Sequence, residues 1–387
     1  MQEEAIRLQV RTVTGLEEIP RNSWNALKGT TNPFLRHEFL AALERHGAAV
    51  PANGWQPMHL LLEEADGALL AAAPAYVKAN SWGEFVFDWS WASAYRQAGL
   101  EYYPKLVLAV PFSPVPGPRV LTGPRVNPGD ACRILASAAE QLCRQQDWSG
   151  VHCLFPDDQQ MRTLGDTGWL YRMGCQFHWE NRGYTDFNAF LESLSSRKRK
   201  NIKRERRIAA ESGLEFAIVP GHRVTADDWH AFHSFYARTF DEHGNLPVLT
   251  PDFFREIGAG LGNAVQMVQA RLAGNMVGAA LLLRSDDTLY GRYWGCRTEL
   301  PGMHFETCYY QGIDYCIREG LVRFEPGAQG EHKVPRGFLP RSTHSLHWIS
   351  EPGFHEAIAR FLDREKVMLR SYMDEMNAHS PYRNARN

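Results

Sequence analysis

The order of predicted elements occurs twice along this chain, and this repeat constrains its fold more than any other feature. In the first half, a helical pattern over 32–47 precedes two apolar runs on either side of Asp66-Gly67, a combination typical of a β-hairpin. Three aromatic residues alternate over 85–89 and predict a further strand. A helix over about 130–146 and the short strand VHCLF complete this half.

The second half follows the same order. Aromatic residues at helical spacing end at the sequence DEHG, and Thr250-Pro251 has the composition of a helix start. Three strands are then predicted, with turns at 274–275 and 286–287, and a helix over about 305–319 leads into the strand LVRFE. The recurring order favours two copies of one mixed α/β architecture, with chance similarity of common elements as the alternative.

Length and charge restrict the class of protein. The 387 residues suffice for about two domains, each able to bury a core. The formal net charge of -2 argues against a generally basic nucleic-acid-binding protein, so any site for a polyanion has to be a local patch.

Cysteine usage and hydropathy indicate the compartment. The seven cysteines are scattered without a C-x-x-C pair, which predicts reduced thiols and no zinc site. No secretory leader opens the sequence and no run approaches the length of about 18 apolar residues needed to span a bilayer. We therefore expect a cytoplasmic protein without stable membrane insertion.

The segment 321–343 is the first candidate site. An apolar run ending in Phe324 changes there into a loop with two glycines, whose backbone amides can approach a ligand closely. The loop combines an acid, a titratable base and two cations, which are costly to bury without partners. These residues are Glu331, His332, Lys333 and Arg336. A polar surface loop after a buried strand is the alternative interpretation.

Other chemistries fit this region poorly. GAQGEHK is not a P-loop, because its lysine does not directly follow the last glycine and is not followed by Ser or Thr. His332, His344 and His347 have no Cys or acid at matching spacing, so we predict no metal site. The absence of a G-x-S-x-G elbow argues against a serine hydrolase. We also predict no bound cofactor.

A strongly basic helix is the second candidate site. It is predicted over 195–212 with Ser196 as its N-cap. Within 197–207, eight basic residues stand against the single acid Glu205, and a polyanion would relieve their repulsion. Three of the basic residues share one helical face: Arg199, Lys203 and Arg206. We predict a phosphate-bearing ligand here, and the alternative is an exposed surface or a stretch that mimics a nuclear-localisation signal.

The aromatic segment LYGRYWG contributes two further candidates. Its rings first suggest a sheet core, but strand residues alternate between faces. Arg292 and Trp294 are therefore candidates to face the groove between the two domains, where a stacked ring would suit a base or a sugar.

The block Arg199-Lys200-Asn201-Ile202-Lys203 resembles the R-x-N-I-K/R helix of the FemAB-type peptidoglycan aminoacyl transferases. The tandem order and the stretch FEPGAQGEHKVPRGF resemble, more specifically, the FemAB-like family of peptidoglycan biosynthesis and recognition proteins. The resemblance covers about 32–349.

The resemblance implies an α/β (α+β) fold of two tandem GNAT-like acyltransferase domains, each a mixed, mostly antiparallel sheet flanked by helices. We expect domain boundaries at 1–180 and 181–387, with the basic helix near the start of the second domain. The amphipathic pattern from Pro352 to Ala378 predicts a long helix near its end. The implied activity is transfer of an activated aminoacyl or acyl group to an amine.

The resemblance also implies residue roles. Arg199 and Lys203 match positions that contact substrate phosphates, and Lys333 matches the lysine near the reacting carbonyl, where negative charge develops. His332 and Glu331 are the candidates to accept the amine proton, with a substrate hydroxyl as the alternative. The remaining substrate-binding candidates are Arg206, Arg336, Arg292 and Trp294.

The donor and acceptor stay open at this stage. The segments TELPGMHFE and RVNPGDACR lack the R/Q-x-x-G-x-G/A pattern of acetyl-CoA users, and no helical hairpin of heptad length is present. We expect a small-molecule or peptide amine as acceptor. Aminoacyl-tRNA is one possible donor, and an acyl thioester on CoA or a carrier protein is the other. A non-catalytic protein that binds a phosphate-rich envelope precursor or RNA is the third alternative.

Overall fold

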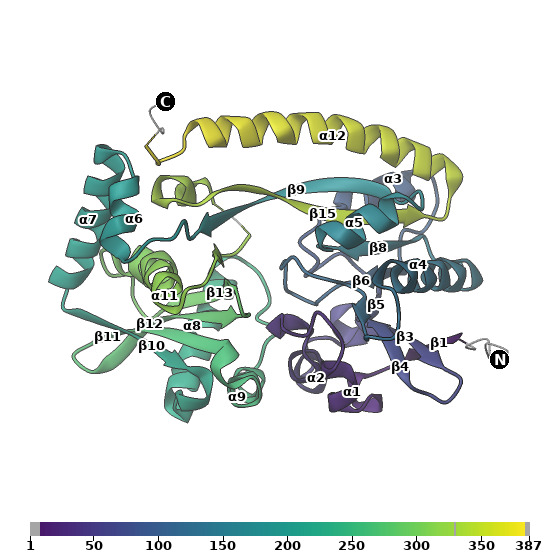
Figure 1. Cartoon of the computed structure of the whole chain (residues 1–387), viewed down its shortest axis with the longest axis horizontal. Helices are drawn as coiled ribbons and strands as arrows, with labels where there is room; N and C mark the ends of the chain where they lie inside the picture. The colour runs from purple at the N-terminus through teal and green to yellow at the C-terminus, as the bar shows by residue number, and fades with distance from the viewer. Residues whose placement is uncertain (1–7, 329, 384–387) are drawn as a thin grey trace. The chain divides into compact units, whose positions relative to one another are not determined.

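A computed structural model describes residues 8–328 and 330–383. The chain divides into two compact units, each made of two segments (Figure 1). Unit 1 comprises Met1–Gly174 and Ser342–Arg370, and unit 2 comprises Cys175–Arg341 and Ser371–Asn387.

Unit 1 contains a small antiparallel sheet and one edge-to-edge series of five strands. The small sheet has the order β1 (Leu8–Val13), β3 (His59–Glu64), β4 (Leu69–Ala73) and β7 (Leu121–Thr122). The series has the order β2 (Trp55–Pro57), β5 (Ala75–Lys78), β6 (Lys105–Leu108), β8 (Gly150–Leu154) and β15 (Leu339–Ile349). The helices are α1 (Arg21–Asn25), α2 (His37–Arg45), α3 (Trp89–Gln97), α4 (Pro128–Gln145) and α5 (Asp158–Gly165).

Unit 2 is organised around six strands. Their order is β10 (Leu214–Pro220), β11 (Val265–Leu272), β12 (Asn275–Arg284), β13 (Thr288–Cys296), β14 (Arg323–Glu325) and β9 (Leu170–Glu180). The helices are α6 (Phe187–Ser193), α7 (Ser196–Glu211), α8 (Ala226–Glu242), α9 (Pro251–Gly260), α10 (Met303–Phe305) and α11 (Gln311–Glu319). A π-helical turn, η6 (Glu306–Tyr310), joins α10 to α11, and a 3-10 helix, η7 (Glu331–Arg336), follows β14.

Both units contain the same strand, helix, strand crossover. In unit 1, β6 and β8 pair in parallel on either side of α4 in the sequence, and in unit 2, β13 and β14 do so on either side of α10 and α11. The other recorded strand pairs are antiparallel. The predicted mixed, mostly antiparallel sheets flanked by helices are therefore confirmed.

The strand next to each crossover comes from the other half of the sequence. In unit 2, β14 pairs with β9, which directly follows the first copy. In unit 1, β8 pairs with β15, which follows the second copy, through Ser345–Ile349 and Gly150–Leu154. The pairing of β8 with β15 explains the second segment of unit 1, whereas the second segment of unit 2 begins within the long C-terminal helix. The linear boundaries at 1–180 and 181–387 stay a prediction.

The strand predicted over 85–89 is wrong. These residues form a loop that enters α3 at Trp89, and Phe85 has a positive φ of 59°. The pattern of buried and exposed side chains is the reverse of the one expected for a half-buried strand. Glu84 and Asp88 are buried, and the neighbouring aromatic rings are exposed. A buried lysine, Lys105, binds both carboxylates and draws them inward.

Other predicted elements agree closely with the structure. The long C-terminal helix α12 runs over Pro352–Ala378, as predicted, and Thr250 caps α9 by accepting a hydrogen bond from the Phe253 amide at 3.2 Å. The N-cap of the basic helix α7 is Ser195 and not Ser196. No helix among the described residues combines the length and apolar character needed to cross a membrane.

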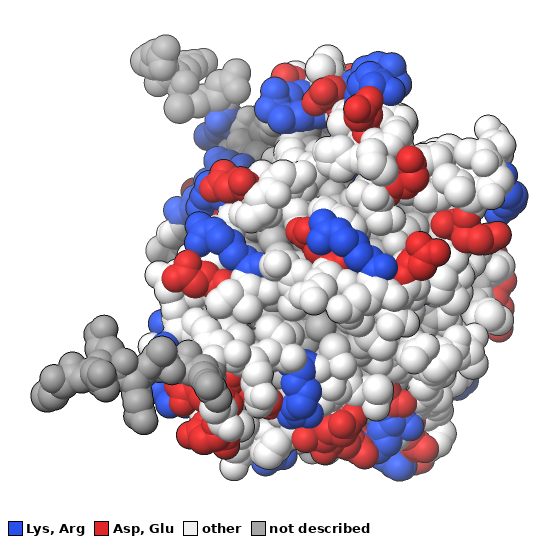
Figure 2. Space-filling view, turned by 90° about the vertical axis from the view of Figure 1, so that its right-hand side faces the viewer, with Lys and Arg blue, Asp and Glu red and all other residues white. Residues whose placement is uncertain are grey.

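Figure 2 presents one face of the molecule, where Lys and Arg side chains alternate with Asp and Glu. This mixture is consistent with the formal net charge of -2. A strongly basic surface can therefore exist only as a local patch. The densest group of Lys and Arg residues in the sequence lies in α7.

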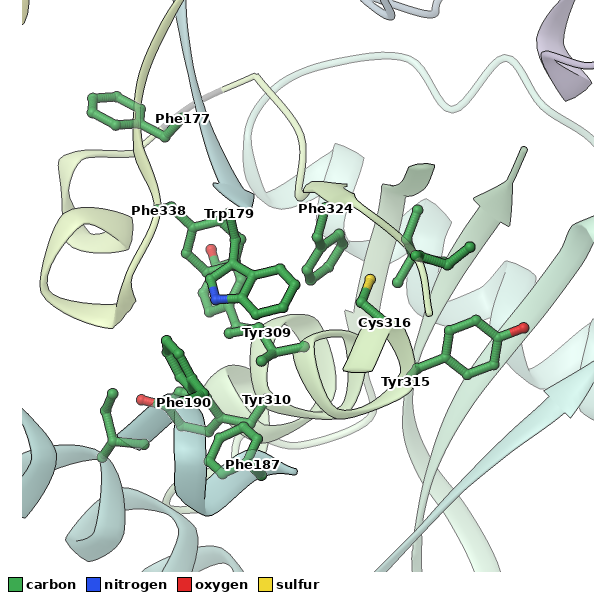
Figure 3. Packing of buried hydrophobic residues seen from close by; sticks show 14 of the residues in the cluster. Phe177, Trp179, Phe187, Phe190, Tyr309, Tyr310, Tyr315, Cys316, Phe324 and Phe338 are labelled. Carbon is green, nitrogen blue, oxygen red and sulfur yellow. The ribbon is translucent and has the colours of Figure 1, made fainter. Parts of the chain in front are cut away.

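An aromatic core in unit 2 fixes the end of β14 (Figure 3). Phe324 of β14 pairs with Trp179 of β9 in the sheet, and its ring lies 5.6 Å from the ring of Phe338, just after η7. Tyr309 of the π-helical turn approaches the same Phe338 ring, at 5.4 Å between ring centres. Three elements that carry polar candidate residues therefore share one apolar support, which limits their relative movement.

We expect Gly295→Ala to destabilise the chain by about 1–3 kcal/mol, because a Cβ there would lie 2.3 Å from the Phe235 carbonyl oxygen of α8. Thermal unfolding measures this change. Gly165→Ala is the matched control, since its added Cβ has no atom within 4 Å. An unchanged melting temperature for Gly295→Ala would contradict the close packing of α8 on β13.

Candidate functional site

The site forms where β13 and β14 part. Their parallel pairing covers only Thr288–Tyr290 and Arg323–Glu325, while β13 continues to Cys296. On the other side of β13, Leu281 faces Tyr293 and Leu282 faces Gly291, so Arg292 is an extra residue in a β-bulge. Bulges change the direction of side chains and often lie beside active sites. We call this region, with the loop that follows β14, the β14 site.

Glu325 ends β14 and is the buried acid of the site. It is only 6% exposed, and no hydrogen-bond partner is recorded for its Oε2 atom among the described residues. Its Oε1 atom lies 3.6 Å from Arg323 Nη1 and 3.9 Å from His178 Nδ1. Burial raises the pKa of the Glu325 carboxyl to about 7, although the Arg323 charge opposes this. A carboxyl of this kind can exchange a proton near neutral pH.

Lys333 points inward from η7. Its side chain is nearly fully buried, and Nζ donates a hydrogen bond of 2.7 Å to the Gly327 carbonyl oxygen. Burial lowers the pKa of the Lys333 ammonium to about 8. Burial, followed by the charges of Arg323, Arg341 and Lys333, lowers the pKa of His178 to about 3. His178 is therefore neutral at pH 7 and forms no charged pair with Glu325.

His332 and Glu331 are exposed, in contrast to Lys333. His332 Nε2 lies 2.8 Å from the Tyr309 hydroxyl, and Glu331 Oε1 accepts a hydrogen bond of 3.0 Å from the Tyr372 hydroxyl. Burial, followed by the Lys333 and Arg336 charges, lowers the pKa of His332, so the ring is neutral at pH 7. The three neighbouring catalytic candidates therefore have different surroundings, and only Lys333 is enclosed.

Two carboxylates tie the basic helix to the site. Glu205 of α7 accepts hydrogen bonds from Nε and Nη2 of Arg336, at 3.2 and 2.8 Å, and another from the Tyr310 hydroxyl. Glu306, in the π-helical turn, accepts hydrogen bonds from Nε and Nη2 of Arg206, at 3.1 and 3.0 Å. Such bidentate pairs are geometrically specific. The guanidinium groups of Arg206 and Arg336 are thus already paired with carboxylates of the protein. Glu306 lies in a π-helical turn, and such turns often mark functional sites.

The remaining cations of this face of α7 are differently placed. Arg199 is half-buried and Lys203 is exposed, and neither has a recorded ion pair within the described part of the chain. One turn of helix separates them, so both can contact one anionic group. Of the three residues predicted to share a face, only Arg206 has an ion pair recorded among the described residues, with Glu306.

Arg292 and Trp294 are both half-buried on β13, and the bulge at Arg292 interrupts the regular alternation of faces between them. The Arg292 guanidinium lies 5.3 Å from the Tyr293 ring centre, and the Trp294 ring lies 5.4 Å from His304. His304 is in turn 6.5 Å from His332. Side chains of β13, α10 and η7 therefore lie near one another at the β14 site, through Trp294, His304 and His332. The expectation that Arg292 and Trp294 line one groove stays a prediction.

Sequence reasoning missed Glu325, Glu205 and Glu306. For Glu325 the sequence did carry a signal. An acid at the last position of an apolar strand, directly before Pro-Gly, can be buried as well as exposed to solvent. Glu205 is the single acid among the eight bases of 197–207, and the sequence pattern indicates only that it offsets their charge. For Glu306 the sequence carried no comparable signal, because its partner Arg206 is 100 residues away.

The site can support transfer of an activated carbonyl group to an amine. A buried ammonium can stabilise charge on a carbonyl oxygen, and a carboxyl with a pKa near 7 can take the amine proton. The duplicated crossover belongs to a fold of two tandem GNAT-like domains. A family model described as FemAB-like, peptidoglycan biosynthesis/recognition, matches residues 15–384, and the chain belongs to that family. Its activity is that of an aminoacyl or acyl transferase in general.

Solved structures share the fold at low sequence identity. The crystal structure of FemX has a TM-score of 0.52 at 11% identity, with 91% of this chain and 100% of that chain covered. The C-terminal domain of a protein described as a putative lysylphosphatidylglycerol synthetase from Agrobacterium fabrum has a TM-score of 0.50 at 10% identity, with 84% and 90% covered. Both are similar in fold alone. No curated protein matches the chain.

We expect Lys333→Met to raise the free energy of unfolding at pH 7 by up to about 3 kcal/mol relative to the wild type. Below pH 8 the wild type buries a charged ammonium. Between pH 8 and about 10.5 the folded form is neutral while the unfolded form stays charged, so the stability of the wild type rises. Urea unfolding at pH 7, 9 and 10.5 checks this. A difference between the two proteins that is constant over this range would contradict it.

Proposed function

We propose that this chain transfers an activated aminoacyl or acyl group from an ester or thioester donor to an amine acceptor at the β14 site. The observation that carries the proposal is a buried carboxyl with an unbonded oxygen, Glu325, close in the chain to a buried ammonium, Lys333, where β13 and β14 part. Membership of the FemAB-like family supports the general reaction.

The proposed step has a defined atom balance. The amine nitrogen attacks the carbonyl carbon, a C–N bond forms, and the amine proton moves to Glu325. Lys333 stabilises the negative charge on the carbonyl oxygen. The C–O or C–S bond then breaks, and the leaving oxygen or sulfur receives the proton that Glu325 holds. A carboxyl with a pKa near 7 can both accept and return this proton at neutral pH.

The other predicted site residues take outer positions in this proposal. His332, hydrogen-bonded to Tyr309, is the second candidate base, and Glu331 lies further out beside Tyr372. Arg292 and Trp294, both half-buried on β13, contact the substrate. Arg199 and Lys203 bind a phosphate of the donor or acceptor. Arg206 and Arg336 are positioning residues, because Glu306 and Glu205 already engage their guanidinium groups.

Two donor classes fit these residues. Aminoacyl-tRNA and acyl-CoA both carry phosphates that Arg199 and Lys203 can contact, whereas they differ in the ester or thioester bond that is broken. Incubating the full chain with charged tRNA, or with a panel of acyl thioesters, together with candidate amines, and measuring product mass separates them. If no donor yields product, then a binding protein for a phosphate-rich envelope precursor or RNA becomes the better proposal.

We expect Lys333→Ala to lower kcat by about 10²–10³-fold with the donor so identified, because the group that stabilises the oxyanion is removed. Glu325→Gln is expected to remove the acid limb of the pH profile of kcat/KM, which should have an apparent pKa near 7. His332→Gln is the matched control for the base. A profile that loses its acid limb in His332→Gln and keeps it in Glu325→Gln would transfer the role of base to His332.

A double variant, Arg199→Gln with Lys203→Gln, tests the phosphate role. We expect weaker binding of the phosphate-bearing substrate and a flatter dependence of log Kd on log salt, by about 0.7 for each phosphate of a single strand that is no longer neutralised. Arg197→Gln with Lys200→Gln, two exposed positions of the same helix, is the control. Equal slopes for the wild type and the first double variant would exclude these two residues from phosphate binding.

A further inference from the structure

The loop between β5 and α3 in unit 1 exposes an unusual group of aromatic rings. Four side chains within eight positions are exposed: Trp82 at 61%, Phe85 at 39%, Phe87 at 62% and Trp89 at 42%. Seven other large apolar residues of the described chain are exposed at 38–80%, but no other stretch of eight described positions holds more than two of them. A contiguous exposed apolar patch commonly marks an interaction site.

The acids of this loop are turned inward. Glu84 and Asp88 are almost fully buried, and both accept from the Lys105 ammonium, Glu84 at 2.9 Å. Asp88 also accepts a hydrogen bond of 2.6 Å from the Tyr102 hydroxyl. Lys78, likewise buried, stacks on the Trp55 ring at 3.7 Å. The loop therefore presents its rings to the outside and keeps its charges neutralised within unit 1.

The exposed rings are also held in place. The Trp82 carbonyl oxygen accepts two hydrogen bonds, from Lys78 Nζ at 3.0 Å and from Trp55 Nε1 at 3.1 Å. The rings of Trp82 and Trp89 pack edge to face at 5.3 Å. Phe85 adopts a left-handed backbone, with a φ of 59°. A loop that could collapse onto the core is instead fixed with its rings outward.

The exposed area and the chemistry of this patch indicate which kind of partner it binds. Four rings, each about half exposed, offer roughly 400 Å², whereas a stable dimer needs about 800 Å² from each partner. A sugar would require exposed hydrogen-bonding side chains, but the charged side chains of the loop point inward. Trp and Phe rings without exposed acids suit the interface of a lipid bilayer, where aromatic residues concentrate.

We propose that this aromatic loop, centred on Trp82, Phe85, Phe87 and Trp89, docks the protein reversibly onto a lipid surface. The rings enter at the level of the headgroups, and no described helix has to span the bilayer. The inference is independent of the reaction at the β14 site, because it rests on residues of unit 1.

Flotation of the full chain with phosphatidylcholine vesicles, in low and in high salt, tests the proposal. We expect binding to these uncharged vesicles, and little weakening at high salt, because it depends on apolar contact and not on charge. Trp82→Ala and Phe87→Ala should each weaken binding about tenfold. Leu246→Ala is the matched control, since Leu246 is 80% exposed and lies in another loop. Circular dichroism and melting temperature verify that each variant is folded.

Four outcomes would overturn the proposal. The first is no flotation with uncharged vesicles, and the second is equal binding of the wild type and the two aromatic variants. The third is binding only to anionic vesicles that disappears at high salt, because it would identify the basic face of α7 as the contact. The fourth is a wild-type dimer in analytical ultracentrifugation that Trp82→Ala dissociates, without vesicle binding, since the loop would then be a surface between two copies.

Discussion

The bidentate pair between Glu205 and Arg336 is the interaction on which the second unit depends. Glu205 lies in a stretch of helix whose other charged residues are all basic, and Arg336 closes the short helix that holds Lys333. Tyr310, from the π-helical turn, donates to the same carboxylate. Because Arg336 is almost fully buried, loss of Glu205 would leave a buried charge without its partner, which costs several kcal/mol. The pair thus fixes the spacing between a basic surface and a buried lysine.

Much of the architecture was predictable from the sequence. Capping residues, turn signals and periodicity located α12, α9 and the meander of β11 to β13, because each of these depends on local chemistry. The loop over 85–89 was not predictable, since its alternation has the period of a strand and only the distant Lys105 reverses which side chains are buried. Pattern analysis assumes that apolar residues point inward, and a buried cation can invert that assignment.

The candidate site was predictable only in part, because the sequence does not show which of its charged residues are buried. The charged cluster from Glu331 to Arg336 indicated a site in this loop, and the family resemblance indicated Lys333 as its catalytic residue. Burial then separates residues that are neighbours in sequence: Lys333 is enclosed while His332 is exposed. The position of Glu325 at the end of an apolar strand was a signal for burial, but the sequence alone does not show how its surroundings change the pKa of the carboxyl. Its pKa near 7 results from burial, and no sequence window contains that information.

The exchanged strands have a consequence for how the chain is made. The sheet of unit 1 pairs β8 with residues 345–349, which leave the ribosome about 190 residues after β8 itself. Until then β8 has an open edge on that side, and such edges invite pairing with other chains. The first copy therefore cannot complete its sheet ahead of the second, even though it comes first in the sequence.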